Sequence, residues 1–250
     1  MKKILGLVTL LSLVLAGCSF QNQPRASKVP TELIQKNKKI WNKKLKRVQM
    51  VEFPGEKIFS VPSGYKDEDM SWARFKNGSQ LVVKARVVNL EPELKRVLTP
   101  ETKASIYIDK VISGDKSLAH ATIKTEFSGG LIRAKNYLVN IEGQYMGKQL
   151  GIKDPQTIVY GQTLTKPIPK IGQTIVLGLN KYHPDNDYQK KIYQKMGLTD
   201  NFYIVNNPEV TFWIKENDKY RLNNPAFYQT ENKAKYSNIF KITKYLNQNF

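Results

Sequence analysis

Apolar and polar side chains alternate repeatedly through residues 70–215, and this pattern limits the possible folds more than any other feature of the sequence. In LVVKARVV (81–88), every second residue is a valine or alanine that faces one way, while Lys84 and Arg86 face the other. Many short strands separated by turns predict a mainly β (α+β) chain whose core is a small β-barrel, OB-like or sandwich. The alternation recurs at 106–109, 121–127, 137–141, 175–179, 202–205 and 210–214.

The order of strands and turn signals adds to this prediction. After LVVKARVV come a strand ending in Gly-Asp (IYIDKVISGD), a strand ending in Gly-Gly (ATIKTEFSGG) and a strand led by glycine (IGQTIVLGL). This order resembles a class of small secreted bacterial β-barrel domains that are OB-like in strand content. The resemblance covers roughly residues 80–180. It implies a barrel and brings no activity with it.

Helical periodicity lies on both sides of the β region. Residues 31–50 carry their apolar side chains broadly on one side and predict an amphipathic helix, and 51–69 predicts a loop. Residues 231–247 predict a closing helix, and Tyr188–Met196 a short helix within a long connection. The expected organisation is a signal peptide at 1–17, a tether at 18–30, a basic helix and loop at 31–69, and a β-barrel-like domain with a C-terminal helix at 70–250.

The first 18 residues have the composition of an export signal. Lys2 and Lys3 precede a mostly apolar run of 12 residues, from Ile4 to Leu15. Such a run forms about 18 Å of helix, whereas the hydrocarbon core of a bilayer is about 30 Å thick. The segment is therefore predicted to be a signal sequence and not a membrane span.

The end of this segment, Leu15-Ala16-Gly17-Cys18, resembles the lipobox of bacterial lipoproteins. The resemblance implies cleavage between Gly17 and Cys18 and a diacylglyceryl group on the Cys18 sulfur, which would anchor the protein on the extracytoplasmic face of the cell membrane. The alternative is an ordinary secretory signal with an unrelated cysteine. Cys18 is the only cysteine, which excludes a disulfide framework and a Cys-based zinc site. The excess of lysine (33) over arginine (7) is typical of a Gram-positive bacterium with an AT-rich genome.

The predicted N-terminal helix carries a run of cations with no acid among them. One interpretation is a surface helix that meets anionic lipid head groups or an anionic wall polymer, since each cation near such a surface contributes roughly 1 kcal/mol. The other is a helix packed on its own domain with a solvated basic back, and both can hold at once. The candidate residues are Lys36, Lys38, Lys39, Lys43, Lys44, Lys46 and Arg47.

Catalytic and metal-binding signals are poor. No nucleophile elbow, P-loop, dinucleotide fingerprint or HExxH motif occurs. The stretch from His183 to Asp187 (HPDND) offers one imidazole and two carboxylates, but its Pro and Asn favour a turn. The triplet Asp67-Glu68-Asp69 is expected to be a solvated turn, and His120 a structural or exposed residue.

We therefore expect no catalytic residue, metal or cofactor. Nothing in the sequence raises Glu126, Glu142 or Asp154 above the other acids. The formal charge of +19 is compatible with nucleic-acid binding, but the export signal and the scarcity of arginine argue against a specific nucleic-acid partner.

Three functions remain open. The first is a lipid-anchored, non-enzymatic envelope module that binds an envelope polymer, a small ligand or another envelope protein. The second is an envelope hydrolase with a site assembled from distant acids, which would show a pocket of convergent carboxylates with shifted pKa values. The third is an immunity or inhibitor-type lipoprotein, which would show an exposed apolar patch.

Overall fold

A computed structural model describes residues 29–250, except 47, 52–60, 140, 163 and 199–200. The predicted signal peptide, lipobox and most of the tether lie outside the described residues. In the part that is described, no helix combines the length and the apolar character that a membrane crossing requires.

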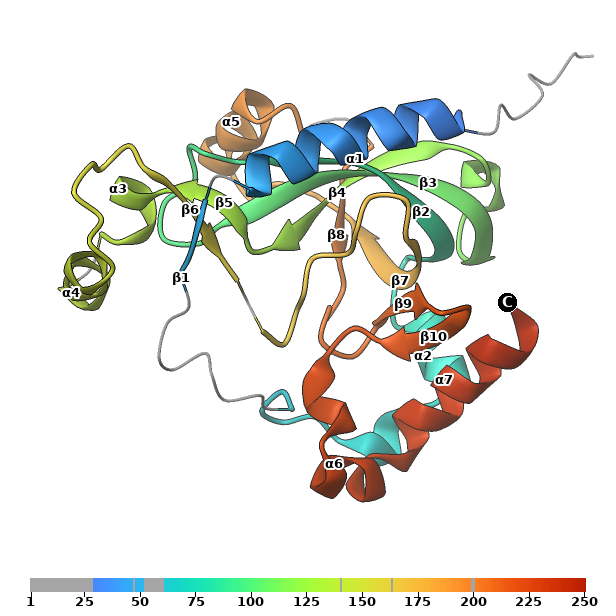
Figure 1. The fold of residues 1–250 in the computed structure, drawn as a ribbon. Coiled ribbons are helices and arrows are strands. Elements are labelled where there is room, and N and C mark those ends of the chain that lie inside the picture. The colour runs from blue at the N-terminus through green and yellow to red at the C-terminus, as the bar shows by residue number, and fades with distance from the viewer. Residues whose placement is uncertain (1–28, 47, 52–60, 140, 163, 199–200) are drawn as a thin grey trace, which may run out of the picture.

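The body of the molecule is a seven-stranded antiparallel sheet (Figure 1). Its strands follow the order β10-β9-β7-β2-β3-β4, and β8 pairs with the end of β7 that β9 leaves free. This confirms a mainly β fold with additional helices. The strands are β2 (Leu81–Pro92), β3 (Glu101–Ser113), β4 (Thr122–Ser128), β7 (Thr174–Lys181), β8 (Tyr203–Val205), β9 (Phe212–Glu216) and β10 (Lys219–Leu222).

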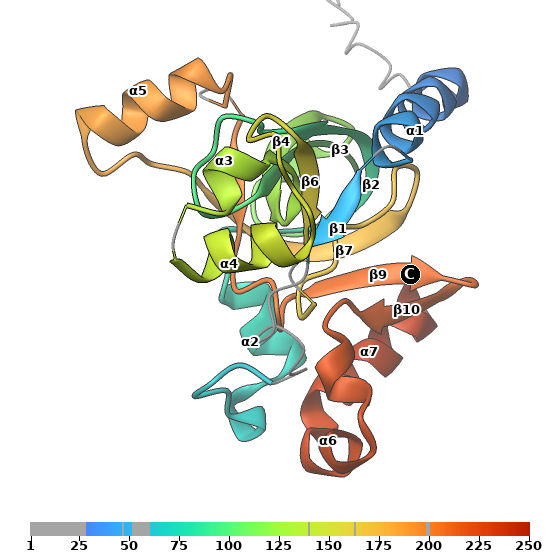
Figure 2. The ribbon, with the colours of Figure 1, turned by 60° about the vertical axis from the view of Figure 1, so that its left-hand side comes forward.

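The sheet curls around a common interior (Figure 2). Register shifts along β2, such as the one between Lys84 and Ala85, mark irregularities of the bulge kind that bend a strand and increase its twist. The curling brings Lys124 of β4 to Phe202, next to β8, where the two residues form one isolated parallel bridge. One bridge is not a ladder, so the described strands do not close into a barrel, which was one of the predicted forms of the core.

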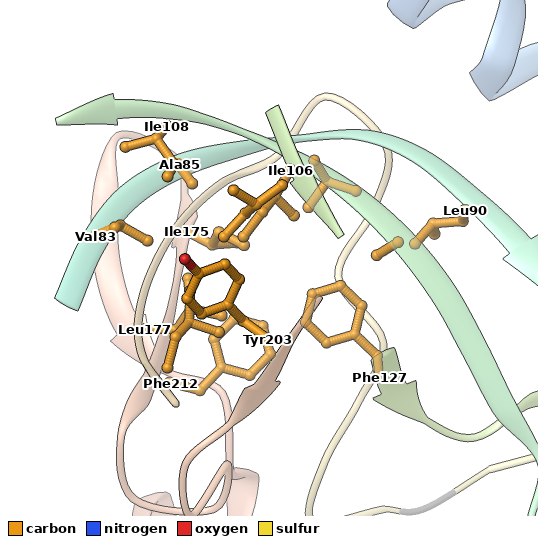
Figure 3. Close-up of a cluster of buried hydrophobic side chains, with 14 of the residues drawn as sticks. Val83, Ala85, Leu90, Ile106, Ile108, Phe127, Ile175, Leu177, Tyr203 and Phe212 are labelled. Atoms are coloured by element: carbon orange, nitrogen blue, oxygen red, sulfur yellow. The ribbon is translucent and has the colours of Figure 1, made fainter. Parts of the chain in front are cut away.

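The interior of the curled sheet is filled by side chains from the predicted inward positions (Figure 3). Val83, Ala85 and Val87 are completely buried, as the alternation predicted. The rings of Phe127 and Phe212 stack with centroids 5.5 Å apart in the same cluster. Burial of this apolar surface is the main stabilising contribution, at about 25 cal/mol per Å².

Helix α1 (Thr31–Leu45) closes one side of this core with Ile34 and Trp41 (Figure 1). It is shorter than the predicted 31–50. The residues Gln49–Val51 form a strand, β1, which pairs in parallel with β6 (Ile158–Gly161). Strand β6 also pairs with β5 (Gly130–Arg133), so β1, β6 and β5 form a second, three-stranded sheet.

Strand β5 begins at a glycine that no other residue could replace without strain. Gly130 has φ +125°, and a Cβ there would lie 2.0 Å from the Thr102 Oγ1. The predicted strand at 137–141 is wrong: α3 (Ala134–Tyr137) and α4 (Ile141–Gln149) occupy this region. These two helices lie in the chain between β5 and β6, and Tyr137 and Leu138 pack on Ile132 and Val159 of the second sheet.

The outer face of the main sheet carries a second apolar cluster, on the side opposite α1 (Figure 1). Val82, Val176 and Trp213 project from the strands into it. The covering elements are α2 (Trp72–Asn77), the 3-10 turn Pro225–Tyr228 and α7 (Ser237–Asn249). Helix α6 (Thr230–Lys235) connects the last two and has no buried residue.

The single predicted helix at 231–247 is therefore two helices, broken at Tyr236. Tyr236 has φ −112° and ψ 63°, and its ring packs 5.5 Å from Tyr65 and 5.2 Å from Phe227. These buried contacts hold the Tyr236 backbone at φ and ψ angles outside the α-helical range.

The acidic triplet at 67–69 is a turn, as predicted, with Glu68 and Asp69 exposed, but its first residue is not solvated. Asp67 is buried, and its carboxylate accepts hydrogen bonds from the backbone N–H groups of Asn238 (2.7 Å) and Ile239 (3.2 Å). The Tyr65 hydroxyl donates to the same carboxylate at 2.9 Å. Asp67 thus supplies the N-terminal cap that α7 lacks locally.

Candidate functional site

The lysines of the predicted anionic-surface set face solvent, while the helix that carries them is held on the core. The Asn37 side chain donates to the Val88 carbonyl oxygen at 3.0 Å, and Ile34 and Trp41 are buried. None of these lysines forms an ion pair with another described residue. Arg47 lies outside the described residues. The exposed lysines are Lys36, Lys38, Lys39, Lys43, Lys44 and Lys46.

An open cleft of about 730 Å³ runs along the N-terminal half of α1. Four cations from four parts of the chain line it: Lys38 of α1, Arg86 of β2, Lys170 from the loop before β7, and Lys215 of β9. We call this cavity, with its four cations, the cationic cleft. Cavities that hold small ligands range from about 300 to 1,000 Å³, so this one is large enough for several groups of an anionic ligand.

Few acids balance these cations. Among the described lining residues, Glu216 is the single acid, and it lies 3.2 Å from Arg221, outside the cleft. Asp109 lies 3.7 Å from Arg86, with the two side chains 24% and 40% exposed. Asp109 and Glu216 together carry two negative charges against the four positive charges of the lining. The cleft therefore keeps an excess of positive charge.

Two more lysines increase this excess on the outer face of the sheet. Lys84 and Lys110 stand directly opposite each other in the β2–β3 pair, and like charges in that position destabilise a sheet. Lys84 donates to the Phe250 carbonyl oxygen at 2.9 Å, and Lys110 lies over the Phe250 ring. Burial lowers the pKa of Lys84, and the neighbouring charge of Lys215 lowers it further.

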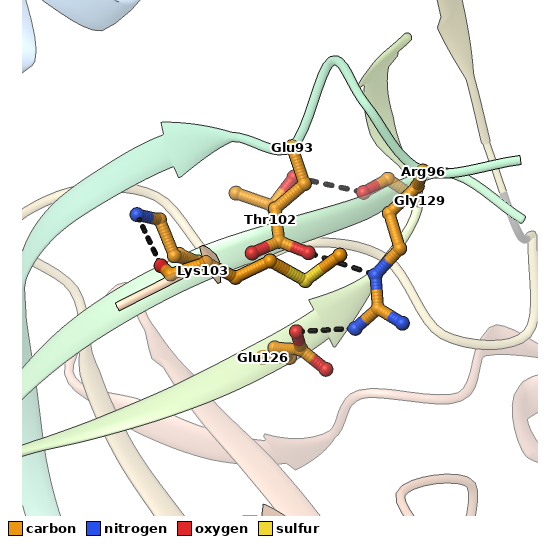
Figure 4. A network of polar contacts seen from close by, with 7 residues as sticks. Glu93, Arg96, Thr102, Lys103, Glu126 and Gly129 are labelled. Atoms are coloured by element: carbon orange, nitrogen blue, oxygen red, sulfur yellow. Dashed lines mark hydrogen bonds and ion pairs between the residues drawn. The ribbon is translucent and has the colours of Figure 1, made fainter. Parts of the chain in front are cut away.

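A much smaller cavity, of about 160 Å³, has two carboxylates in its wall, Glu101 and Glu126. Arg96, between β2 and β3, donates to Glu126 at 2.5 Å and to Glu93 at 2.8 Å (Figure 4). The ring of Tyr193, from α5 (Asp187–Lys195), lies 5.5 Å from the guanidinium. We call Glu93, Glu101, Glu126 and Arg96 the carboxylate cluster.

Burial dominates the protonation of this cluster. It raises the pKa of Glu101 to about 7 and that of Glu126 to about 8, although Arg96 acts in the opposite direction on both. The Glu93 side chain is only 3% exposed, and its Oε1 has no hydrogen-bond partner among the described residues. The cluster meets the criterion set above for a hydrolase, but its cavity is below the usual size of a ligand site.

The remaining candidates stand apart from both sites. His120 is exposed, with its Nδ1 3.3 Å from the Tyr107 hydroxyl. His183 is exposed before α5, and Asn186 caps that helix by accepting from the Gln189 N–H at 2.9 Å. Across the described ranges, no group of three or more His, Cys, Asp or Glu side chains could hold a metal ion.

Of the other two acids that the sequence left unmarked, Asp154 lies apart from the carboxylate cluster. Asp154 accepts from the Gln156 N–H in a turn at 2.8 Å, and the side chain of Glu142 is outside the described set.

Sequence reasoning missed most of the cationic cleft. The alternation places Lys84 and Arg86 together on the polar side of one strand, and this predicts only the position of Arg86 among the four cleft residues. Lys170 and Lys215 are single lysines in separate stretches, and only the folded chain brings them to Lys38.

Comparison of the chain with protein-family models, with curated proteins and with solved structures finds no match. The function must therefore be argued from the geometry.

Proposed function

We propose that this chain is a lipid-anchored, non-enzymatic module on the outer face of the cell membrane that binds an anionic envelope polymer through the cationic cleft. The observation that carries the proposal is the convergence of Lys38, Arg86, Lys170 and Lys215 on one open cleft with little acidic compensation. A cleft lined by charges of one sign concentrates oppositely charged ligands, so these cations attract a polyanion.

The exposed lysines of α1 extend the same surface. A polymer seated in the cleft reaches Lys36 and Lys39 on the solvent side of the helix, where each ion contact contributes on the order of 1 kcal/mol at low salt. Lysines act as point charges and suit a repeating phosphate better than a single planar group. A phosphodiester polymer is therefore the ligand class that this surface fits.

The anchor and the barrel belong to the same proposal. Attachment at Cys18, after cleavage behind Gly17, would keep the module at the membrane, and a tether of residues 18–30 would reach about 40 Å. The curled sheet would serve as an OB-like scaffold that holds β2, β7 and β9 side by side beneath the cleft. No cofactor and no specific nucleic acid enters the proposal.

Charge reversal in the cleft tests the proposal. In the unacylated full chain (Cys18→Ala), the double variant Lys38→Glu/Lys170→Glu should bind poly(glycerol phosphate) at least about tenfold more weakly at low salt, since two attractive contacts become repulsive. Binding by the parent chain should fall steeply as salt rises, and the variant should show a shallower dependence. Isothermal titration at several salt concentrations measures both.

The matched control is Lys190→Glu/Lys191→Glu, which changes the net charge equally on the exposed face of α5. It should retain most of the binding. Equal weakening by the two double variants would mean that the polymer responds to net charge alone, and the cleft would then not be a site.

The carboxylate cluster favours a second candidate, the envelope hydrolase. Glu101 and Glu126 with raised pKa values have the character of acid catalysts. Hydrolysis of purified wall glycan by the parent chain, abolished in Glu126→Gln, would favour this function over binding. We rank it second because the cavity is small and Arg96 engages two of the three carboxylates.

A further inference from the structure

An apolar groove of about 690 Å³ lies along the C-terminal half of α1, on a different stretch of the helix from the cationic cleft. Helix α1 and Val48 form one wall, the end of β2 another, and strands β5 and β6 a third. The apolar residues of the groove are Ile40, Val48, Pro92, Leu94, Leu131 and Ile158.

The groove leaves apolar surface in contact with water. Ile40 is 48% exposed although it faces other apolar side chains, and Met50 on the neighbouring strand β1 is 47% exposed. Each methylene group that a ligand buries in such a groove contributes about 0.8 kcal/mol. A hydrocarbon chain needs no directional partner there, and Thr157 is the only uncharged polar residue among those described in the lining.

The charge at the groove selects the kind of hydrocarbon. Lys43 and Lys44 also line it, and neither forms an ion pair within the described residues. An ammonium beside an apolar groove complements a ligand whose apolar tail ends in a negatively charged head. The volume of the groove lies in the range of small-ligand sites. A protein partner would need a contact area of about 800 Å² on this chain, which is more than one groove provides.

We propose that the apolar groove binds one acyl chain of an anionic membrane lipid, with the lipid phosphate at Lys43 and Lys44. The source of the lipid rests on the proposed location at the membrane. The binding of an acyl chain and a phosphate in the groove does not depend on the proposed polymer binding, because the groove and the cationic cleft share no residue. Helix α1 would then carry two sites, a polymer site at its first half and a lipid site at its second half.

Titration with alkyl phosphates below their micelle concentrations tests this site in the full chain carrying Cys18→Ala. The leader is common to all variants, so its contribution cancels when they are compared. From hexyl to octyl to decyl phosphate, the affinity should rise by about twofold to fourfold for each methylene. The variant Ile40→Glu places a carboxylate in the groove and should weaken decyl phosphate binding at least about tenfold.

Leu33→Glu is the matched control, because Leu33 is a 42% exposed apolar residue seven positions before Ile40, on the same side of α1 but outside the groove. It should bind decyl phosphate like the parent chain. Lys43→Gln/Lys44→Gln should lose about tenfold for decyl phosphate and little for the uncharged decyl maltoside.

Three outcomes would overturn the lipid site: affinity that does not depend on chain length, equal losses in Ile40→Glu and Leu33→Glu, or unchanged binding in both. A protein partner would then be the better occupant of the groove. The polymer proposal is tested separately, since Ile40→Glu should still bind poly(glycerol phosphate) and Lys38→Glu/Lys170→Glu should still bind decyl phosphate.

Discussion

Two glutamates with raised pKa values make this fold sensitive to pH. Glu101 and Glu126 face Arg96 and Glu93, the ring of Tyr193 lies beside Arg96, and Lys166 lies near Glu101. In the unfolded chain both carboxyls have a pKa near 4.5, whereas in the fold the values are about 7 and 8. The folded state therefore binds more protons than the unfolded state throughout that interval.

We predict that the free energy of unfolding falls by several kcal/mol as the pH rises from 5 to 8. The loss begins above pH 4.5, where the unfolded chain ionises first, and ends once the folded carboxyls have ionised near pH 8. Glu101→Gln should reduce this dependence, because the amide does not titrate and only the contribution of Glu126 is left. Urea unfolding at several pH values measures it, and parallel curves for the parent and the variant would contradict the assignment.

At the scale of elements, the N-terminus of α7 depends on a residue far away in the sequence. The turn of Asp67–Asp69 (Figure 1, beside α2) places the buried Asp67 carboxylate on two backbone N–H groups of the helix. A carboxylate there satisfies donors that would otherwise be buried without partners, and it complements the positive end of the helix dipole.

Removing this cap with Asp67→Ala should destabilise the fold by about 1–2 kcal/mol. Asp69→Ala is the matched control, since Asp69 is exposed in the same turn, and it should cost less than about 0.5 kcal/mol. Chemical denaturation of the three proteins measures the difference. Equal stability of Asp67→Ala and Asp69→Ala would show that the distant cap does not contribute.

The strands that the sequence predicted best are those with one buried and one exposed face. Strand β4 and much of β3 alternate because their inner residues fill a core and their outer residues reach water or a polar neighbour. Strand β7 is buried on both faces, with Val176 in the outer cluster, and it was predicted from its apolar residues. Strands β5, β6 and β10 were missed, since each has only four residues and offers too few positions for a period to show.

The helical errors have tertiary causes. The pattern at 137–141 satisfies an alternation as well as a short helix does, and packing of Tyr137 against the second sheet decides for the helix. The break at Tyr236 depends on rings from distant segments, Tyr65 and Phe227. Local patterns carry no information about such contacts.

The candidate sites also contain one part that a local pattern predicts and parts that it does not. The exposed lysines of α1 form a contiguous run and could be predicted. The cationic cleft needs Arg86, Lys170 and Lys215 from three other segments, and the carboxylate cluster needs Arg96 between acids of three different segments. Sites assembled across a curled sheet depend on register and curvature, which neither composition nor periodicity specifies.

For the molecule as a whole, the lipid anchor remains the decisive prediction. We expect the protein isolated from its own cell to begin at Cys18 and to carry a diacylglyceryl group on that sulfur, which intact mass spectrometry measures directly. Cys18→Ala should leave the leader uncleaved and abolish the mass increase. A parent protein that retains Met1, or that starts elsewhere with a free thiol, would remove the anchor from the proposed function.

The contact between Asp67 and α7 also determines when the fold can be completed. The carboxylate and the amides it holds are 171 residues apart, and the last helix covers a face built from strands that precede it. A chain that emerges from its N-terminus cannot complete the cover of that face until the thirteen residues of α7 have been made. Before that point, part of the outer apolar cluster stays in contact with water.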